Sequence, residues 1–203
     1  MTSIHRGMTV DEALQRLREK ARPGALEGMS KYGMSIDSRL GVSMPEIRKL
    51  AGEIGKAHGL AMGLWKSGIA EARILATMVA DPRMLTGDEM ELWVKDFDSW
   101  DICDEVCMNL FDKSPFAREK VFEWAGREEE FVKRAAFSLI ACLAWHDKSA
   151  GDAAFLEFLP VIARAATDER NFVKKAVNWA LRHIGKRNLR LNAAAIEAAR
   201  RIG

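Results

Sequence analysis

The sequence has few cysteines and histidines, the residues that form disulfides or bind structural metal ions in small proteins. It contains only three cysteines, Cys103, Cys107 and Cys142, and no CxxC pair. An odd number without that spacing argues against a disulfide framework and a structural zinc site. We expect the cysteines to be small buried hydrophobes. His146 and His183 are isolated from other metal-ligand types, so the sequence predicts neither a metal nor a cofactor.

Long apolar segments are also missing. No run is long enough to span a bilayer, and residues 1–11 lack the apolar core of a signal peptide. With unpaired cysteines, these absences predict a cytoplasmic protein with no membrane partner, and we expect a monomer.

No stretch alternates apolar and polar residues as a strand does. Apolar residues instead recur at spacings of three and four, and Pro, Gly or Asp-Pro separates several of the segments. Thr9 with Glu12 forms a capping-box pattern, and Ser43 with Pro45 marks a second helix start. Helices are predicted over 9–20, 43–58, 62–67, 69–80, 88–95, 100–112, 117–125, 129–145, 150–166, 171–184 and 193–202. A short helical segment is also predicted between Gly24 and Lys31.

Two helices are related by an internal repeat. Phe131-Val132-Lys133-Arg134-Ala135-Ala136 matches Phe172-Val173-Lys174-Lys175-Ala176-Val177 at a shift of 41 residues. That period is typical of HEAT-type helical pairs, which stack into a solenoid with a concave face. We therefore predict an all-α, HEAT-like superhelix that forms a single domain over residues 1–203. A globular helical bundle is the alternative.

Charge is divided unevenly along the chain. The net charge is +2, but residues 170–203 hold nine Lys and Arg against one acid, giving +8, and residues 1–169 give −6. Such asymmetry favours a polyanionic partner, most often nucleic acid. A basic terminal helix that is only a solvated face is the other interpretation.

Trp100 and Asp104 lie four residues apart, so a helix places them on one face. The indole gains by burial, whereas the carboxylate loses hydration unless a cation or polar group compensates. The pair therefore predicts a partner on another element. The alternative is a core Trp100 on a helix capped by Asp98 or Asp101.

Two further residues fit a site with this pair. Arg134 lies in an apolar stretch, where a guanidinium needs an anion such as Asp104 or a phosphate. Trp179 shares a stripe with Lys175 and Arg182, a mixture that is rare in core helices. A purely structural Asp104–Arg134 salt bridge, or a Trp179 buried beneath snorkelling bases, would produce the same patterns.

Three motifs in order resemble the AlkD-like DNA alkylation repair glycosylases. They are Ser99-Trp100-Asp101-Ile102-Cys103-Asp104, the Phe131–Ala136 motif, and the Phe172–Arg182 motif that ends Asn178-Trp179-Ala180-Leu181-Arg182. The segment Leu40–Arg48, Leu64-Trp65 and Glu71 also resemble that family. The chain departs from it at Ser99, where the family often has a second tryptophan.

The resemblance implies a concave face that binds duplex DNA and removes cationic N3- and N7-alkylated purines without a metal, and without flipping the base. By the resemblance, Asp104 is the catalytic carboxylate, Trp100 and Trp179 face the lesion, and Arg134 binds a phosphate. Asp104 would stabilise the oxocarbenium character of the sugar as the glycosidic bond breaks. Arg134 would also keep Asp104 ionised.

Several other basic or aromatic residues are candidates for DNA contacts. The α-helical stripe of Trp179 and the helix ends or loops nearby provide Lys175, Arg182, Lys186, Arg187, Arg190 and Lys148, and Tyr32 is an aromatic candidate near the lesion. Lys148, Arg187 and Arg190 could equally be plain surface. A non-catalytic helical-repeat module that binds damaged or branched DNA by shape is the alternative function, since fold does not fix activity. A protein-binding scaffold is disfavoured by the basic C-terminal segment.

Overall fold

The computed structural model describes residues 7–202, and these residues form helices and no strand. The remaining residues of the predicted 1–203 domain, 1–6 and 203, lie outside the described part. The chain divides into two compact units, one up to Leu85 and one from Thr86 onward. The all-α prediction is confirmed for the described residues.

The first unit is a set of short helices in which α5 packs against α3 and α4, and α1 packs against α4. The predicted capping box at Thr9 and Glu12 is present at the start of α1. The unit comprises α1 (Val10–Glu19), η1 (Pro23–Ala25), α2 (Leu26–Lys31), α3 (Met44–Ile54), α4 (His58–Lys66) and α5 (Ala70–Val79).

Glu71, in the first turn of α5, anchors the loop before α3. Its side chain is buried at 1% exposure, and its carboxylate accepts hydrogen bonds from the backbone N–H groups of Leu40, Gly41 and Val42 at 2.9, 2.7 and 3.3 Å. Gly41 has a φ of +77°, which a residue with a Cβ adopts only with strain. One buried acid thus satisfies three donors and fixes this turn.

Glu71→Ala is expected to destabilise the first unit by about 2–4 kcal/mol, because it orphans three backbone donors, of which two are fully buried. Urea unfolding followed by circular dichroism measures the loss. Glu53→Ala, which removes one exposed carboxylate of the same unit, is the matched control and should change stability by less than about 1 kcal/mol. Equal effects of the two substitutions would contradict the anchoring role.

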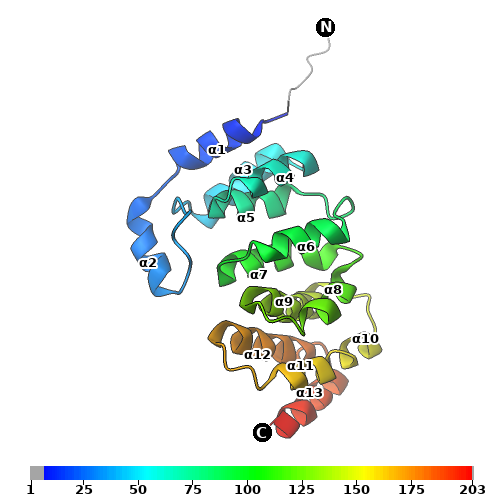
Figure 1. The fold of residues 1–203 in the computed structure, drawn as a ribbon. Coiled ribbons are helices and arrows are strands. Elements are labelled where there is room, and N and C mark those ends of the chain that lie inside the picture. The colour runs from blue at the N-terminus through cyan, green and yellow to red at the C-terminus, as the bar shows by residue number, and fades with distance from the viewer. Residues whose placement is uncertain (1–6, 203) are drawn as a thin grey trace. The chain divides into compact units, whose positions relative to one another are not determined.

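The second unit contains three helices side by side, with α9 packed between α7 and α12 (Figure 1). The α8 helix packs on α9, and α11 and α13 pack on α12, so the row has a second helical layer behind it. The unit comprises α6 (Gly87–Lys95), α7 (Trp100–Asn109), η2 (Phe111–Lys113), α8 (Ala117–Trp124), α9 (Glu130–His146), α10 (Asp152–Leu156), α11 (Leu159–Ala165), α12 (Asn171–Gly185) and α13 (Leu189–Ile202).

The internal repeat of the sequence appears as equivalent positions on α9 and α12. The rings of Phe131 and Phe172 lie 5.5 Å apart, at the first turns of the two helices. Lys133 pairs with Asp168 at 2.9 Å across the same junction. Repeating residues 41 positions apart therefore meet in space, as stacked helical repeats require.

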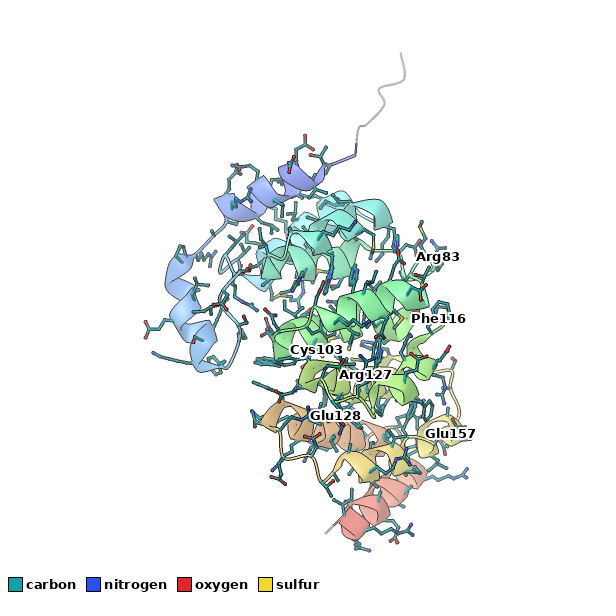
Figure 2. All side chains as sticks on the ribbon, viewed as in Figure 1. Arg83, Cys103, Phe116, Arg127, Glu128 and Glu157 are labelled. Atoms are coloured by element: carbon teal, nitrogen blue, oxygen red, sulfur yellow. The ribbon has the colours of Figure 1, made fainter. Side chains whose placement is uncertain are left out.

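The three cysteines are buried, as expected. Cys103 lies on the side of α7 next to α9, where its thiol points to the carbonyl of Phe131 at 3.8 Å (Figure 2). Cys107 makes the same kind of contact one turn later with Ala135 at 3.7 Å. Burial raises the pKa of Cys107 well above its ordinary value, so this thiol stays protonated.

Several predicted helix bounds differ from the structure. α4 begins at His58 instead of 62, α7 ends at Asn109 instead of 112, and α13 begins at Leu189 instead of 193. Two further differences have a backbone cause. The helix predicted over 43–58 ends at Ile54, because Gly55 follows with a φ of +71°, and a new helix begins at His58. The helix predicted over 150–166 is two helices, α10 and α11, since Pro160 lies in the first turn of α11 and offers no N–H to continue α10.

Candidate functional site

The site is built around an ion pair between α7 and α9. Arg134 donates to both carboxylate oxygens of Asp104, from Nε to Oδ1 at 3.1 Å and from Nη2 to Oδ2 at 2.7 Å. This fork-to-fork geometry fixes the plane of the carboxylate. The side chains retain 6% exposure at Arg134 and 17% at Asp104. The salt bridge that the sequence offered for Arg134 is therefore present, and the carboxylate is the more accessible partner.

Two further contacts complete the pair. The hydroxyl of Ser138, one turn after Arg134 on α9, donates to Asp104 Oδ1 at 2.8 Å. The remaining nitrogen of Arg134, Nη1, donates to the carbonyl of Phe172 on α12 at 2.6 Å. Arg134 thus joins all three helices of the row. With each of its three nitrogens engaged, little of its surface remains for the phosphate contact predicted from the resemblance.

Burial and pairing act in opposite directions on Asp104. Desolvation raises the pKa of its carboxyl above the ordinary value, while the Arg134 guanidinium and the Ser138 hydroxyl counteract that rise. Asp104 in turn raises the pKa of Arg134 against the effect of burial. The ionised form of Asp104 therefore depends on its contacts with Arg134 and Ser138, and acidification protonates Asp104 at a higher pH than it would an exposed aspartate.

Trp100 begins α7 and shares the face of Asp104, four residues later. It is half-buried, so it is not the core tryptophan of the alternative interpretation. That interpretation is also wrong about the cap, because the residue at the N-cap is Ser99. Asp101 is buried and accepts a hydrogen bond from the Ser99 hydroxyl.

Trp179 lies midway along α12, one helix away from α9, and is half-buried. The ring of His183, one turn later, meets it edge-on at 5.7 Å. The indole is neither fully buried nor fully exposed, so it forms part of the surface of the helical row. Trp100, Arg134 and Trp179 therefore come from the three neighbouring helices α7, α9 and α12.

The exposed face of α12 is basic. Lys175, Arg182 and Lys186 follow the helical period of Trp179 and are exposed, and within residues 7–202 none of them forms an ion pair. Cations that are not neutralised by neighbouring acids are available to an external anion. We call these three residues the α12 basic face.

Two of the predicted DNA contacts have structural partners. Arg187 donates from Nη1 to the carbonyls of Ala144 and Asp147 at 2.9 and 2.8 Å, and it lies over the ring of Phe155 at 3.9 Å. It therefore caps the C-terminus of α9. Arg190 is exposed and lies 3.8 Å from Asp152. Their role in binding stays a prediction.

Tyr32 belongs to the first unit, where it follows α2 and is 77% exposed. Its role in binding also stays a prediction. Among residues 7–202 no group of His, Cys, Asp and Glu is arranged to hold a metal ion. No helix in that part of the chain is long and apolar enough to cross a membrane.

Ser138 is the site residue that the sequence did not reveal. It is a lone hydroxyl inside the apolar stretch of α9, four residues after Arg134 and so on the same face. A buried hydroxyl is normally hydrogen-bonded, and this spacing was the signal that could have identified it. The Phe172 carbonyl had no such signal, because backbone groups look alike in a sequence.

Comparisons with known proteins agree on the fold. The model of a family described as DNA alkylation repair enzyme matches residues 13–202. A solved structure described as "A new family of proteins related to the HEAT-like repeat DNA glycosylases with affinity for branched DNA structures" superimposes with a TM-score of 0.83. The two chains are 19% identical, and the match covers 97% of this chain and 84% of that one. None of the curated proteins matches this chain.

Proposed function

Because the chain belongs to the DNA alkylation repair enzyme family, we propose that it is a DNA glycosylase acting on duplex DNA. Its substrates would be cationic N3- and N7-alkylated purines, whose glycosidic bond it hydrolyses. The observation that carries the proposal is Asp104. This carboxylate is held in one orientation by two partners, keeps part of its surface exposed, and shares a helix face with a tryptophan.

The chemistry requires little more than such an anion. An alkylated purine carries a positive charge and leaves without protonation by an acid. The sugar gains positive charge as the bond breaks, and a carboxylate about 4 Å away stabilises it by roughly 4 kcal/mol at an effective dielectric near 20. That is about a thousandfold in rate. The charge of Arg134 opposes this effect, so the figure is an upper bound for Asp104 within the pair.

The other residues have distinct roles in the proposal. Trp100 and Trp179 present electron-rich faces that attract a cationic nucleotide and shape the surface around its sugar. Asp104 also orients the water that adds to the sugar as the purine leaves. Arg134 and Ser138 position Asp104 through the contacts described above. We assign no phosphate contact to Arg134, because its guanidinium is already engaged.

Release of 7-methylguanine or 3-methyladenine from methylated duplex DNA tests the activity directly. Purified protein should release one or both at a rate well above that of spontaneous depurination, and addition of EDTA should leave the rate unchanged. A protein that binds the duplex but releases neither base would contradict the glycosylase proposal.

A second candidate is a non-catalytic module that recognises branched DNA by shape. Two observations favour it. The structurally similar protein is described by its affinity for branched DNA, and the Asp104–Arg134 pair also serves as a link between helices. An anion facing phosphates weakens DNA binding, however, so a pure binding protein gains nothing from a partly exposed Asp104. Base release separates the two candidates.

The α12 basic face is expected to make binding strongly dependent on salt. Replacing Lys175 or Arg182 by Gln should weaken binding of any DNA sequence and lower the slope of log K against log salt by about 1 for each residue. Fluorescence anisotropy over a salt series measures the slope.

Arg164→Gln is the matched control for this series. It removes an exposed charge from α11, outside the α12 basic face, and should leave the slope unchanged. An affinity that does not respond to salt, or an equal effect of the control, would contradict binding through this face.

A further inference from the structure

A pocket lies at the C-terminal ends of α9 and α12, away from the Asp104–Arg134 pair. It measures about 530 Å³ and is lined by Ala144, Trp145, Lys148, His183, Lys186 and Arg187. This volume lies within the usual range for pockets that hold small ligands, about 300–1,000 Å³. Its lining combines aromatic rings with cations, and it contains no acidic residue.

Trp145 provides a rigid flat surface beside this pocket. Its side chain is 48% exposed, although an indole normally gains from burial. The ring of His146 lies 4.6 Å away at an angle of 31°, so it backs one face of the indole. His146 Nδ1 is in turn bonded to the carboxylate of Asp112, whose side chain is fully buried. The indole is therefore supported from behind while much of it remains accessible.

Positive charge surrounds this flat surface. Lys148 and Lys186 are exposed, and neither forms an ion pair with any residue in the range 7–202. His183 adds a second ring, 6.2 Å from Trp145 and edge-on to it. Burial and the nearby cations lower the pKa of His183, so its ring is neutral at pH 7. The ligand that fits has a flat aromatic part and an anionic part.

We propose that this pocket holds an unpaired nucleotide of a single-stranded DNA arm, with the base stacked on Trp145 and its phosphate between Lys148 and Lys186. A paired base cannot use such a surface, because its faces are covered by its neighbours in the duplex. Aromatic stacking with cations along the backbone is the common mode of single-strand binding. This inference rests on the DNA binding proposed above but not on base release.

The pocket is separate from the reactive site. Trp145 lies eleven positions after Arg134 on α9, which is about 16 Å along a helix. A nucleotide in the pocket is therefore not the one whose sugar faces Asp104. The edge-on contact of His183 with Trp179 places the pocket one helical turn further along the same surface of α12. The protein would thus contact a duplex and an unpaired arm at once.

Binding of two unmodified probes tests the inference: a fully paired duplex, and the same duplex with a thymidine arm of about six nucleotides. Anisotropy at fixed salt should show roughly tenfold tighter binding of the armed probe by the native protein. Trp145→Ala should remove that gain and leave the affinity for the paired duplex unchanged. Trp145→Phe, which keeps a ring, should retain most of it.

Leu92→Ala is the matched control, since Leu92 is 65% exposed on α6, outside the pocket. It should change neither affinity. Because Trp145 is exposed, its variants should keep the native circular dichroism spectrum and melting temperature. Equal weakening of both probes by Trp145→Ala, or no gain from the arm in the native protein, would overturn the inference.

Two further measurements identify the ligand of the pocket and separate the pocket from duplex binding. Free thymidine monophosphate should not displace the arm at micromolar concentration, and displacement there would assign the pocket to free nucleotides instead. If the native protein binds the duplex and releases alkylated bases but gains nothing from the arm, only the pocket inference fails. If it does not bind the duplex at all, the proposed function fails with it.

Discussion

Asp104→Asn is expected to lower base release from methylated duplex DNA by about 100- to 1,000-fold, with DNA affinity within about threefold of the native value. The amide preserves the size of the side chain and one acceptor, but it removes the negative charge that would stabilise the sugar. Single-turnover release of 7-methylguanine measures the rate. The native rate should also fall on acidification, at a pH above the ordinary pKa of an aspartate, because burial raises the pKa of Asp104.

Two variants show whether the loss comes from the charge or from the fold. Ser138→Ala keeps the Asp104 carboxyl group and its Arg134 partner and removes one hydrogen bond, so it should lower release by less than about tenfold. Asp104→Asn combined with Arg134→Gln restores a neutral pair, and it should remain folded and inactive. Full activity in Asp104→Asn, or in the double variant, would exclude the proposed role.

Arg134→Ala is expected to destabilise the second unit by about 3–5 kcal/mol, because it leaves the Asp104 carboxylate largely buried without its cation. It also orphans the Phe172 carbonyl that Arg134 contacts on α12. The melting temperature should fall by roughly 10 °C. Differential scanning calorimetry or thermal circular dichroism measures the change.

Arg201→Ala is the matched control for this loss. It breaks the Arg201–Glu197 pair on α13, where both side chains are more than half exposed, and should change stability by less than about 1 kcal/mol. Similar melting temperatures for Arg134→Ala and the native protein would mean that the buried Asp104–Arg134 pair contributes nothing to the stability of the second unit.

The helices and their order could be predicted from the sequence, because an apolar stripe at helical spacing is a local property. Thr9 and Glu12 show the same for a cap, since the whole motif lies within four residues. The split of the 150–166 segment was missed although Pro160 was visible, because the apolar stripe continues across the break. The division into two units involves contacts between distant residues and left no local signal.

Only part of the candidate site could be predicted from the sequence. An arginine in an apolar stretch demands an anion, and that physical requirement led from Arg134 to Asp104. Nothing in the sequence showed that Arg134 also reaches the Phe172 carbonyl, or that Arg187 caps α9. These contacts depend on how neighbouring helices are placed against one another. The exposure of Trp145 was hidden for the same reason.

One guanidinium contacts both Asp104 and the first turn of α12. It therefore fixes the position of the Asp104 carboxylate relative to α12 and to the basic side chains that this helix carries. A shift of α12 along its axis would break the hydrogen bond from Arg134 to the Phe172 carbonyl. It would also weaken the bidentate contact of Arg134 with Asp104. In the proposed DNA complex, Arg134 would thereby link the position of Asp104 to that of a phosphate bound by the α12 basic face. Lysine could not replace it, since a single ammonium lacks the rigid planar fork that spans these directions.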